Sequence, residues 1–488
     1  MESLISFNEN NSYFDKIYFS MYEKNKSLLN YLNKAINVAK TPINYYFQNY
    51  FKITHINTRR TLKYYVQCFQ NIIFFGNCKT LISEIFSKTG GIAMKKRRAA
   101  GIFASVMLAA GVLAGCNSST SGGGEKGADK GDVIKIGANL ELSGGVASYG
   151  QSIKEGIELA FEEINKDGIN GKKLELVPFD NKSDAPEAIN GATKLTSQDK
   201  VTAIIGAATS GNTKAQIEIA QGQKVPLLTP TGTAEDVTFS NGKLNDYVFR
   251  TCFIDPFQGT VAAQFATNEL KAKTAAIFID SASDYSKGLA ASFKELFEKE
   301  GGKIVKEEAY VAKDTDFNAQ LTNIKGKKPD FIFIPGYYEE VGLIVKQARD
   351  LGITAPMMGA DGWDSPKLIE LAGKDALNNT FITNHYSSGD SDPKVQEFVQ
   401  AFKAKYSDKS PDAFNALGYD SAYFLADAIK RAGSADPEKI QKALAETDGL
   451  ELVTGKMKLD DKHNPIKSAV ILEYKNGEQT FKTKVNPE

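Results

Sequence analysis

The sequence predicts an α/β fold of two doubly wound lobes, each with a parallel sheet covered by helices on both faces. The first observation is an alternation, from residue 132 onward, of short apolar runs rich in Ile and Val with segments of helical periodicity. The second is that this alternation comes in two successive series, the second beginning at Phe257. The third is length, because residues 116–488 are too many for one typical domain and suit two.

The first series predicts four strands separated by three helices. In the longest helix Ile153, Ile157 and Phe161 recur on one face, as in a helix that covers a sheet. The strands are expected at 133–137, 173–179, 201–205 and 225–228, and the helices at 151–166, 186–196 and 212–221.

The second series predicts a second lobe, and the tail that follows it predicts elements that could belong to either lobe. Because tail elements could join either lobe, we expect the chain to cross between the lobes several times. The second series is expected to hold a helix from 257, strands at 275–279, 330–334 and 357–358, and helices at 289–299 and 340–351. The tail is expected to hold helices at 393–406, 413–432 and 437–446, then strands at 456–459, 469–475 and 479–485.

A secretory signal peptide is expected well inside the chain. Four basic residues follow Met94, and the apolar run 99–112 and Leu-Ala-Gly then precede Cys116. The apolar run is too short to span a bilayer comfortably, and a cysteine after Leu-Ala-Gly resembles the lipobox of bacterial lipoproteins. We therefore expect residues 94–115 to be a lipoprotein signal peptide and Cys116 to carry lipid; an ordinary buried apolar helix is the alternative.

The segments on either side of this signal are not expected to belong to the mature fold. Residues 1–93 are rich in Asn, Lys, Ile, Tyr and Phe, and a signal peptide this far into a chain is unusual. We interpret them as a gene-model extension, with a genuine cytoplasmic or helical extension as the alternative. Residues 116–131 are rich in Gly and Ser, so we expect the lipidated cysteine to be followed by a flexible linker.

Composition argues against several classes of function. Residues 116–488 carry ten more acidic than basic side chains, which argues against nucleic acid as a partner. The two histidines there have no cysteine or histidine partners at ligand spacing, so we expect no metal site. Gly-x-Ser-x-Gly elbows, Walker-type loops and dinucleotide fingerprints are absent, so we expect neither catalysis nor a cofactor. Cys252 is expected to be a buried, inert thiol.

A series of motifs extends in order over about 350 residues. They are SGGVASYG (143–150), DNKSDAPEA (180–188), IIGAATSGNT (204–213), PLLTPTGTA (226–234), DYSKG (284–288), DTDF (314–317), PGYYEE (335–340) and MGADGWD (358–364). In order and spacing they resemble the type I periplasmic binding proteins. More narrowly, the chain resembles the leucine/isoleucine/valine-binding proteins of branched-chain amino acid ABC transporters.

The resemblance implies two lobes joined by three crossings, near Pro256, Thr383 and Gly455, with a ligand cleft between them. Lobe 1 would comprise 132–255 and 384–455, and lobe 2 would comprise 256–383 and 456–488. It also implies a binding protein, not an enzyme, which closes on a branched-chain amino acid and delivers it to a permease and ATPase. We expect a monomer held by lipid at the extracytoplasmic face of the cell membrane.

Two polar loops follow predicted strands of the first lobe, at 208–211 and 229–233. In open α/β sheets ligands bind beyond the carboxyl ends of strands, where helix N-termini direct amide groups at anions. Both loops are therefore suited to hold the carboxylate of a free amino acid; helix capping is the alternative for each hydroxyl. By resemblance, Ser210 and Thr233 contact the carboxylate and amine, and Thr231 contributes its backbone carbonyl.

The resemblance places the remaining contacts across the cleft. Tyr337 and Asp361 would engage the polar end of the ligand, with Asp361 as an exposed carboxylate that pairs with the ammonium group; an Asx-turn is the alternative. The family often has glutamate at this position, so the shorter aspartate is a departure. An apolar wall is expected from Tyr149, Ala208, Tyr285, Trp363 and Phe414, with ordinary core packing as the alternative for the aromatic residues.

Two other functions stay open on the sequence. Within the same fold, the ligand could be another amino acid, an amide or urea. From a different class, the protein could be a sensory module that passes ligand binding to a membrane signalling partner. Gene neighbours would separate these alternatives, since a permease and ATPase pair favours transport and a histidine kinase favours sensing.

Overall fold

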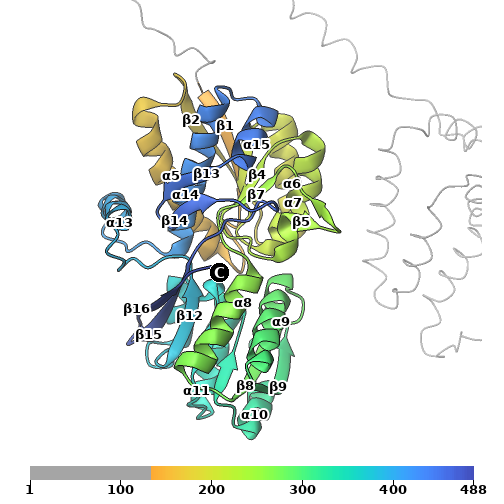
Figure 1. The fold of residues 1–488 in the computed structure, drawn as a ribbon, viewed down its shortest axis with the longest axis vertical. Helices are drawn as coiled ribbons and strands as arrows, with labels where there is room; N and C mark the ends of the chain where they lie inside the picture. Colours follow the sequence, from red (N-terminus) through yellow and green to blue (C-terminus); the bar gives the residue numbers. More distant parts are fainter. Residues whose placement is uncertain (1–132, 488) are drawn as a thin grey trace, which may run out of the picture. The chain divides into compact units, whose positions relative to one another are not determined.

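The computed structural model describes residues 133–487. The predictions for residues 1–93, the signal peptide 94–115 and the linker 116–131 with Cys116 lie outside the described residues. The described part of the chain forms two α/β lobes, each built around its own sheet (Figure 1). Among these residues no helix is both long and apolar enough to cross a bilayer.

The first lobe is built on a five-stranded parallel sheet of order β2-β1-β3-β4-β7. The short strands β3 and β4 are buried throughout, because helices cover both faces of the sheet. The strands are β1 (Val133–Leu140), β2 (Lys173–Asp180), β3 (Ala203–Gly206), β4 (Leu227–Thr229) and β7 (Val248–Arg250). The helices that follow β1, β2 and β3 are α5 (Ala147–Asp167), α6 (Ala185–Lys194) and α7 (Ser210–Gln223).

The second lobe is built on a seven-stranded sheet of order β16-β15-β12-β11-β10-β8-β9. Five of its strands are parallel, but β15 and β16 are antiparallel, so the predicted parallel sheet is mixed at one edge. The strands are β8 (Thr274–Asp280), β9 (Lys303–Tyr310), β10 (Phe331–Phe333), β11 (Met357–Gly359), β12 (Thr380–Asn384), β15 (Ala469–Lys475) and β16 (Glu478–Val485). The helices are α8 (Asp255–Gln264), α9 (Asp284–Lys299), α10 (Asn318–Lys327), α11 (Tyr338–Asp350) and α12 (Pro366–Ala372).

The tail returns to the first lobe before it completes the second sheet (Figure 1). Helix α14 packs along α5, and it lies between α13 and α15 in the sequence. The hairpin β13–β14 follows as a separate two-stranded sheet, so the strand predicted at 456–459 does not join the second sheet. These elements are α13 (Pro393–Lys405), α14 (Ala413–Ala432), α15 (Pro437–Ala445), β13 (Asp448–Leu452) and β14 (Gly455–Lys458).

The antiparallel pairing of β15 with β16 has a local cause. Asn476 and Gly477 join β15 to β16, and both have positive φ, 51° and 83°. An Asn-Gly pair with positive φ at both positions makes the tight turn that suits the right-handed twist of a hairpin. Two neighbouring strands joined in this way must be antiparallel.

Most predicted elements are confirmed, but the strands β7, β9, β12 and β13 and the helices α10 and α12 are not predicted. Strand β7 has three residues inside an apolar stretch, and β9 carries charged side chains on a partly exposed edge strand. The prediction of a buried Cys252 is confirmed, and burial raises the pKa of its thiol to about 12. The thiol therefore stays protonated at neutral pH.

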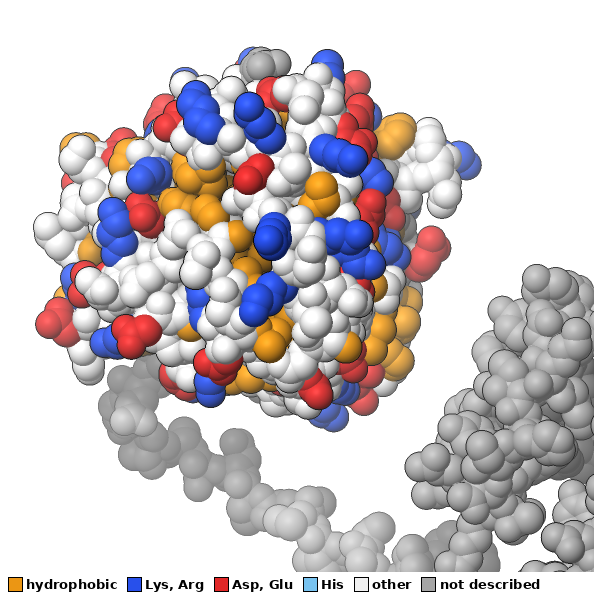
Figure 2. Space-filling model, turned by 90° about the horizontal axis from the view of Figure 1, so that it is seen from below, with side chains coloured by type: hydrophobic (Ala, Val, Ile, Leu, Met, Phe, Trp, Pro, Cys, Tyr) orange, Lys and Arg blue, Asp and Glu red, His pale blue; other side chains and the backbone are white. Residues whose placement is uncertain are grey.

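The surface carries charges of both signs. Figure 2 shows Lys and Arg side chains interspersed with Asp and Glu on the face of the molecule seen from below, with small apolar groups between them. The large apolar side chains that are exposed, such as Ile189, Val311 and Phe481, lie on different elements. The face in Figure 2 therefore lacks the wide basic patch that nucleic-acid binding requires.

Two glycines allow the close approach of α5 and α14. A Cβ atom at Gly418 would lie 2.3 Å from the backbone oxygen of Ile153, and one at Gly156 would lie 2.0 Å from that of Asn415. We expect Gly418→Ala to lower the free energy of unfolding by about 1–3 kcal/mol, because the helices must separate. Urea unfolding measures this, with Gly222→Ala as control, since a Cβ at that exposed site of α7 has open space. Equal stability of the two variants would contradict the packing argument.

Candidate functional site

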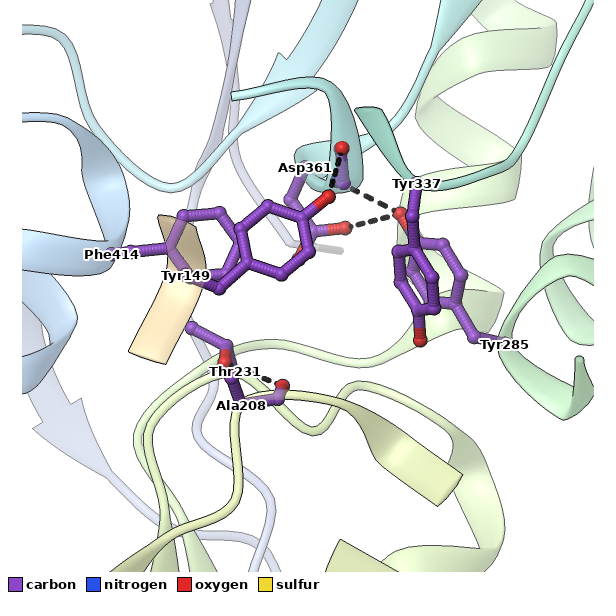
Figure 3. Close-up of a pocket in the computed structure, with 8 residues that line it drawn as sticks. Tyr149, Ala208, Thr231, Tyr285, Tyr337, Asp361 and Phe414 are labelled. Carbon is purple, nitrogen blue, oxygen red and sulfur yellow. Dashed lines mark hydrogen bonds between the residues drawn. The ribbon is translucent and has the colours of Figure 1, made fainter. Parts of the chain in front are cut away.

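The candidate site is a small pocket lined by residues of both lobes (Figure 3). Seven of the ten residues expected to contact ligand line it. The lining residues are Tyr149, Ala208, Thr231 and Phe414 from the first lobe, and Tyr285, Tyr337, Asp361 and Gly362 from the second. Ser210, Thr233 and Trp363 are not among them.

Topology explains why these residues meet. Ala208 follows β3 and Thr231 follows β4, so both lie at the carboxyl end of the first sheet. Tyr285, Tyr337 and Asp361 follow β8, β10 and β11 in the same way in the second sheet. The carboxyl ends of two parallel sheets therefore face each other, which is where open α/β sheets bind ligands.

Two stacked aromatic pairs form the walls of the pocket. Tyr149 stacks on Phe414 with ring centres 4.2 Å apart, and Tyr285 stacks on Tyr337 at 5.0 Å. Tyr149 also meets Tyr337 edge to face at 5.8 Å, so the first pair contacts the second across the lobes. In Figure 3 the Tyr337 ring extends from the second lobe toward the loop that carries Thr231. The walls therefore consist of apolar aromatic rings, and the tyrosines carry hydroxyl groups at the ring edges.

A buried carboxylate holds the loop between β3 and α7. Glu141, which has no exposed surface, accepts hydrogen bonds from the backbone amides of Ala208 and Thr209 at 2.9 and 3.1 Å. It also accepts one from the Thr209 hydroxyl at 2.9 Å and one from the Asn212 side chain at 2.8 Å. Thr209 in turn caps α7 through the amide of Asn212. The sequence reasoning missed Glu141, although a lone acidic residue at the end of an apolar strand could have drawn attention.

A buried guanidinium holds the loop after β4. Arg250 has no exposed surface and donates to the backbone oxygens of Gly232 at 2.8 Å and Ala234 at 2.9 Å. The Ser210 hydroxyl accepts a hydrogen bond from the amide of Ala234 at 3.1 Å, which joins this loop to the start of α7. Thr231 donates to the backbone oxygen of Ala208 at 2.6 Å. The two loops therefore form one hydrogen-bonded unit.

Three side chains hold the carboxylate of Asp361. Tyr285 and Gln258 donate to Oδ1 at 2.8 and 3.0 Å, and His385 Nε2 lies 3.2 Å from Oδ2. Asp361 is 3% exposed, so the expectation of an exposed, mobile carboxylate is wrong. Burial lowers the pKa of His385 although Asp361 opposes this, so the imidazole is neutral at neutral pH and donates from Nε2. These contacts hold the Asp361 carboxylate in one orientation.

Trp363 lies in the core and is not among the residues that line the pocket, which agrees with the alternative of ordinary core packing. Its ring is fully buried, and Nε1 donates to the backbone oxygen of Ile334 at 2.9 Å. The ring occupies the space beside Gly359, where a Cβ atom would lie 1.9 Å from Nε1. Trp363 therefore packs behind the turn that carries Asp361.

The loop after β3 gives a direct test of Glu141. Glu141→Gln is expected to lower the free energy of unfolding by about 2 kcal/mol, because the amide would place a donor against the N–H of Ala208 or Thr209. Faster hydrogen exchange at these two amides should accompany the loss. Glu175→Gln, on an exposed position of β2, is the control. Unchanged exchange in Glu141→Gln would contradict the assigned role.

Comparisons with known proteins agree with this geometry. The model of the periplasmic binding protein family matches residues 133–479. A leucine-, isoleucine-, valine-, threonine- and alanine-binding protein of Pseudomonas aeruginosa is 35% identical over 332 residues, 68% of this chain and 87% of that protein. A Leu/Ile/Val-binding protein of Rhizobium johnstonii is also 35% identical, over 66% of this chain and 85% of that protein.

Solved structures show the same relationship. A leucine-binding protein of Thermotoga maritima is 41% identical with a TM-score of 0.69, over 72% of this chain and 99% of that chain. A branched-chain amino acid binding protein of Streptococcus pneumoniae, solved with isoleucine, is 40% identical with a TM-score of 0.69, over 73% of this chain and 100% of that chain. A solute-binding protein of R. palustris, solved with benzoate, is 25% identical with a TM-score of 0.66, over 73% of this chain and 97% of that chain. These comparisons confirm the resemblance to leucine/isoleucine/valine-binding proteins. The chain therefore belongs to the periplasmic binding protein family and has its type I fold.

Proposed function

We propose that the protein is the substrate-binding component of an ABC transporter, which captures a branched-chain amino acid outside the cytoplasm and delivers it to a permease. The observation that carries the proposal is the composition of the pocket, with polar loops and Asp361 at one side and stacked aromatic rings as walls. The relatives named for leucine, isoleucine and valine support the same ligand class.

Each part of an amino acid has a candidate partner in or beside the pocket. The carboxylate would meet the first amides of α7, which have no partner inside the helix, and the hydroxyl of Ser210. The ammonium group would meet Asp361, Thr233, the Thr231 carbonyl and the Tyr337 hydroxyl, and a charge-assisted bond to Asp361 would be the strongest of these. The aliphatic side chain would lie against Tyr149 and Phe414.

Lobe closure is the proposed mechanism of capture. The described conformation already has contacts between the lobes: the Tyr149 hydroxyl donates to the Gly362 backbone oxygen, and the hydroxyls of Ser148 and Ser365 are 2.8 Å apart. Lys214 of α7 bonds to Asp284 of α9 at 2.7 Å. A ligand that contacts both lobes favours the closed state by its higher affinity for that state. The permease would then recognise the closed surface.

A further part of the proposal concerns attachment to the membrane through Cys116 and the permease and ATPase partners. Lipid on Cys116 would keep the protein at the extracytoplasmic face, where a monomer delivers ligand to a permease and its ATPase. The lobe boundaries near Pro256, Thr383 and Gly455 belong to the same proposal. Loss of the protein from the membrane fraction in Cys116→Ser would support the anchor, and full retention would contradict it.

Benzoate binding by one structural relative suggests a second ligand class, aromatic carboxylates. Asp361 argues against it here, because a buried carboxylate in the pocket wall repels an anion that brings no positive charge. An amino acid carries both charges and avoids this cost.

A thermal-shift screen of the purified protein tests the ligand class. Ligand that binds only the folded protein raises the melting temperature by mass action. We expect stabilisation by leucine, isoleucine and valine, and none by benzoate, amides or urea. Asp361→Asn should weaken leucine binding roughly 10- to 100-fold by calorimetry, since a bond to a charged group contributes about 1.5–3 kcal/mol.

Asp375→Asn is the matched control for this variant, because Asp375 is exposed on the same lobe. Its leucine affinity should equal that of the unmodified protein. Undiminished binding by Asp361→Asn would remove Asp361 from the site, and no shift with any amino acid would overturn the ligand class.

Lys214 allows a test of lobe closure. Lys214→Ala removes the bond to Asp284 across the lobes, and we expect leucine affinity at low salt to fall up to about fivefold, since an exposed ion pair contributes at most about 1 kcal/mol. The difference should shrink at high salt. Lys287→Ala is the control, because Lys287 bonds to the same carboxylate at 2.7 Å but lies on the same helix. An equal effect of both variants on affinity would argue against the contact across the lobes.

A further inference from the structure

The short turn η4 (Asp361–Trp363) of the second lobe is followed by two residues that contact the first lobe. Asp364, 3% exposed, accepts a hydrogen bond from the backbone amide of Ala413, the first residue of α14, at 2.8 Å. The hydroxyls of Ser365 and Ser148 lie 2.8 Å apart, and Ser148 belongs to α5. Helices α5 and α14 pack on each other in the first lobe. The start of α14 therefore binds a carboxylate that the second lobe supplies.

The second lobe holds Asp364 from two sides. Asn384, at the end of β12, donates to Oδ2 at 2.9 Å, and Gln479 of β16 donates to Oδ1 at 2.7 Å. Both oxygens of Asp364 therefore have a partner in their own lobe, and Oδ2 also accepts from the amide of Ala413. When the lobes move apart, Asp364 would follow the second lobe and Ala413 the first.

A second carboxyl group, that of Asp412, lies at the same end of α14. Its Oδ1 accepts a hydrogen bond from the amide of Asn415 at 2.9 Å, and its Oδ2 accepts one from the hydroxyl of Ser152 in α5 at 2.7 Å. Asp412 is partly buried and directly precedes Ala413, whose amide binds Asp364. Two carboxyl groups, one from each lobe, therefore meet at the first turn of α14.

The environment of Asp412 favours its protonated form. Burial, and then the negative charge of Asp364, raise the pKa of Asp412 to about 7, although its hydrogen bonds and the charge of Lys409 oppose this. The Lys409 ammonium bonds to Glu155 of α5 at 2.6 Å and not to Asp412. The titratable and charged groups around Asp412 on neighbouring elements are Asp364, Tyr386, Tyr474, Lys409 and Glu155.

We infer that Asp364 and Asp412 form a proton-linked clasp between the lobes: closure brings the two carboxyl groups together, and Asp412 takes up a proton as they meet. A buffer acid in the solvent gives up this proton, and an O–H bond forms on the Asp412 carboxylate. Opening of the lobes separates the two groups and returns the proton to solvent. The inference rests on the proposed function, because leucine binding is the process through which closure is measured.

The sign of the pH dependence follows from this proton uptake. In the open protein Asp412 would have the ordinary aspartate pKa of about 3.9, and closure raises it. Between the two values the closed state binds more protons than the open state, so a fall in pH favours closure. We expect the affinity for leucine to rise about tenfold from about pH 8 to about pH 6. Leucine itself stays a zwitterion through this range and contributes nothing to the change.

Isothermal titration with leucine in two buffers measures the proton directly. Phosphate and Tris differ strongly in ionisation enthalpy, so a proton taken from the buffer makes the binding heat less exothermic in Tris. We expect uptake of about half a proton at about pH 7 and of nearly one at about pH 6. Leucine binding with equal heats in both buffers would overturn the inference and leave the proposed function standing.

The variant Asp412→Asn assigns the proton to this residue. Asparagine caps helices about as well as aspartate does, but it has no carboxyl group to titrate. We expect its affinity for leucine at about pH 8 to exceed that of the unmodified protein at least about tenfold, and the rise toward pH 6 to be lost. A damaged fold would lower the affinity, so this gain separates the clasp from a purely structural role.

Two further variants complete the test. Asp364→Asn removes the neighbouring negative charge and should move the rise in affinity to lower pH. Asp436→Asn is the matched control, because Asp436 is an exposed residue that caps α15 through the amide of Lys439 at 3.0 Å. Its pH profile should equal that of the unmodified protein. An unchanged profile in Asp412→Asn, or a changed one in Asp436→Asn, would overturn the assignment.

Discussion

The site depends on one constraint, which is that the backbone of two buried loops must keep its hydrogen bonds. The loop after β3 meets this constraint through Glu141, which accepts from two amides, and the loop after β4 through Arg250, which donates to two carbonyl oxygens. An anion suits the first loop because its N–H groups point inward, and a cation suits the second because its C=O groups do. Both charged side chains are buried. Removing either one would leave the backbone groups of its loop without hydrogen-bond partners, and this costs more free energy than the hydrogen bonds themselves contribute.

Because other residues satisfy the loop backbones, polar groups of the site remain available for ligand. The first lobe supplies hydrogen-bond donors at the start of α7, and the second supplies an acceptor, Asp361, whose position Tyr285, Gln258 and His385 fix. This division suits a zwitterion, whose two charges are a few bonds apart. Preformed partners of this kind cost little reorganisation on binding, so more of the contact energy appears as affinity.

The sequence predicts the order of elements and most of the pocket, and the reasons are physical. Strand and helix periods are local, and residues that follow parallel strands gather at one edge, so Ala208 and Thr231 could be placed without coordinates. Glu141 could not, because its partners lie 67 to 71 residues away and a lone carboxylate gives no sign of them. Trp363 was expected in the ligand wall, but Gly359 leaves room for its ring in the core, and the sequence does not show that this space exists.

The balance of charge explains why closure should follow ligand binding. Asp361 is the one carboxyl group among the residues that line the pocket, and Glu141 is buried behind the loop that carries Ala208. Closing the lobes over a site without ligand would remove the Asp361 carboxylate from water and bring no positive charge to it, which is unfavourable. An amino acid would supply an ammonium group for Asp361 and a carboxylate for the start of α7, so the same closure would then pair the groups that it buries. Charge imbalance in the empty pocket would therefore hold the lobes apart until a zwitterion arrives.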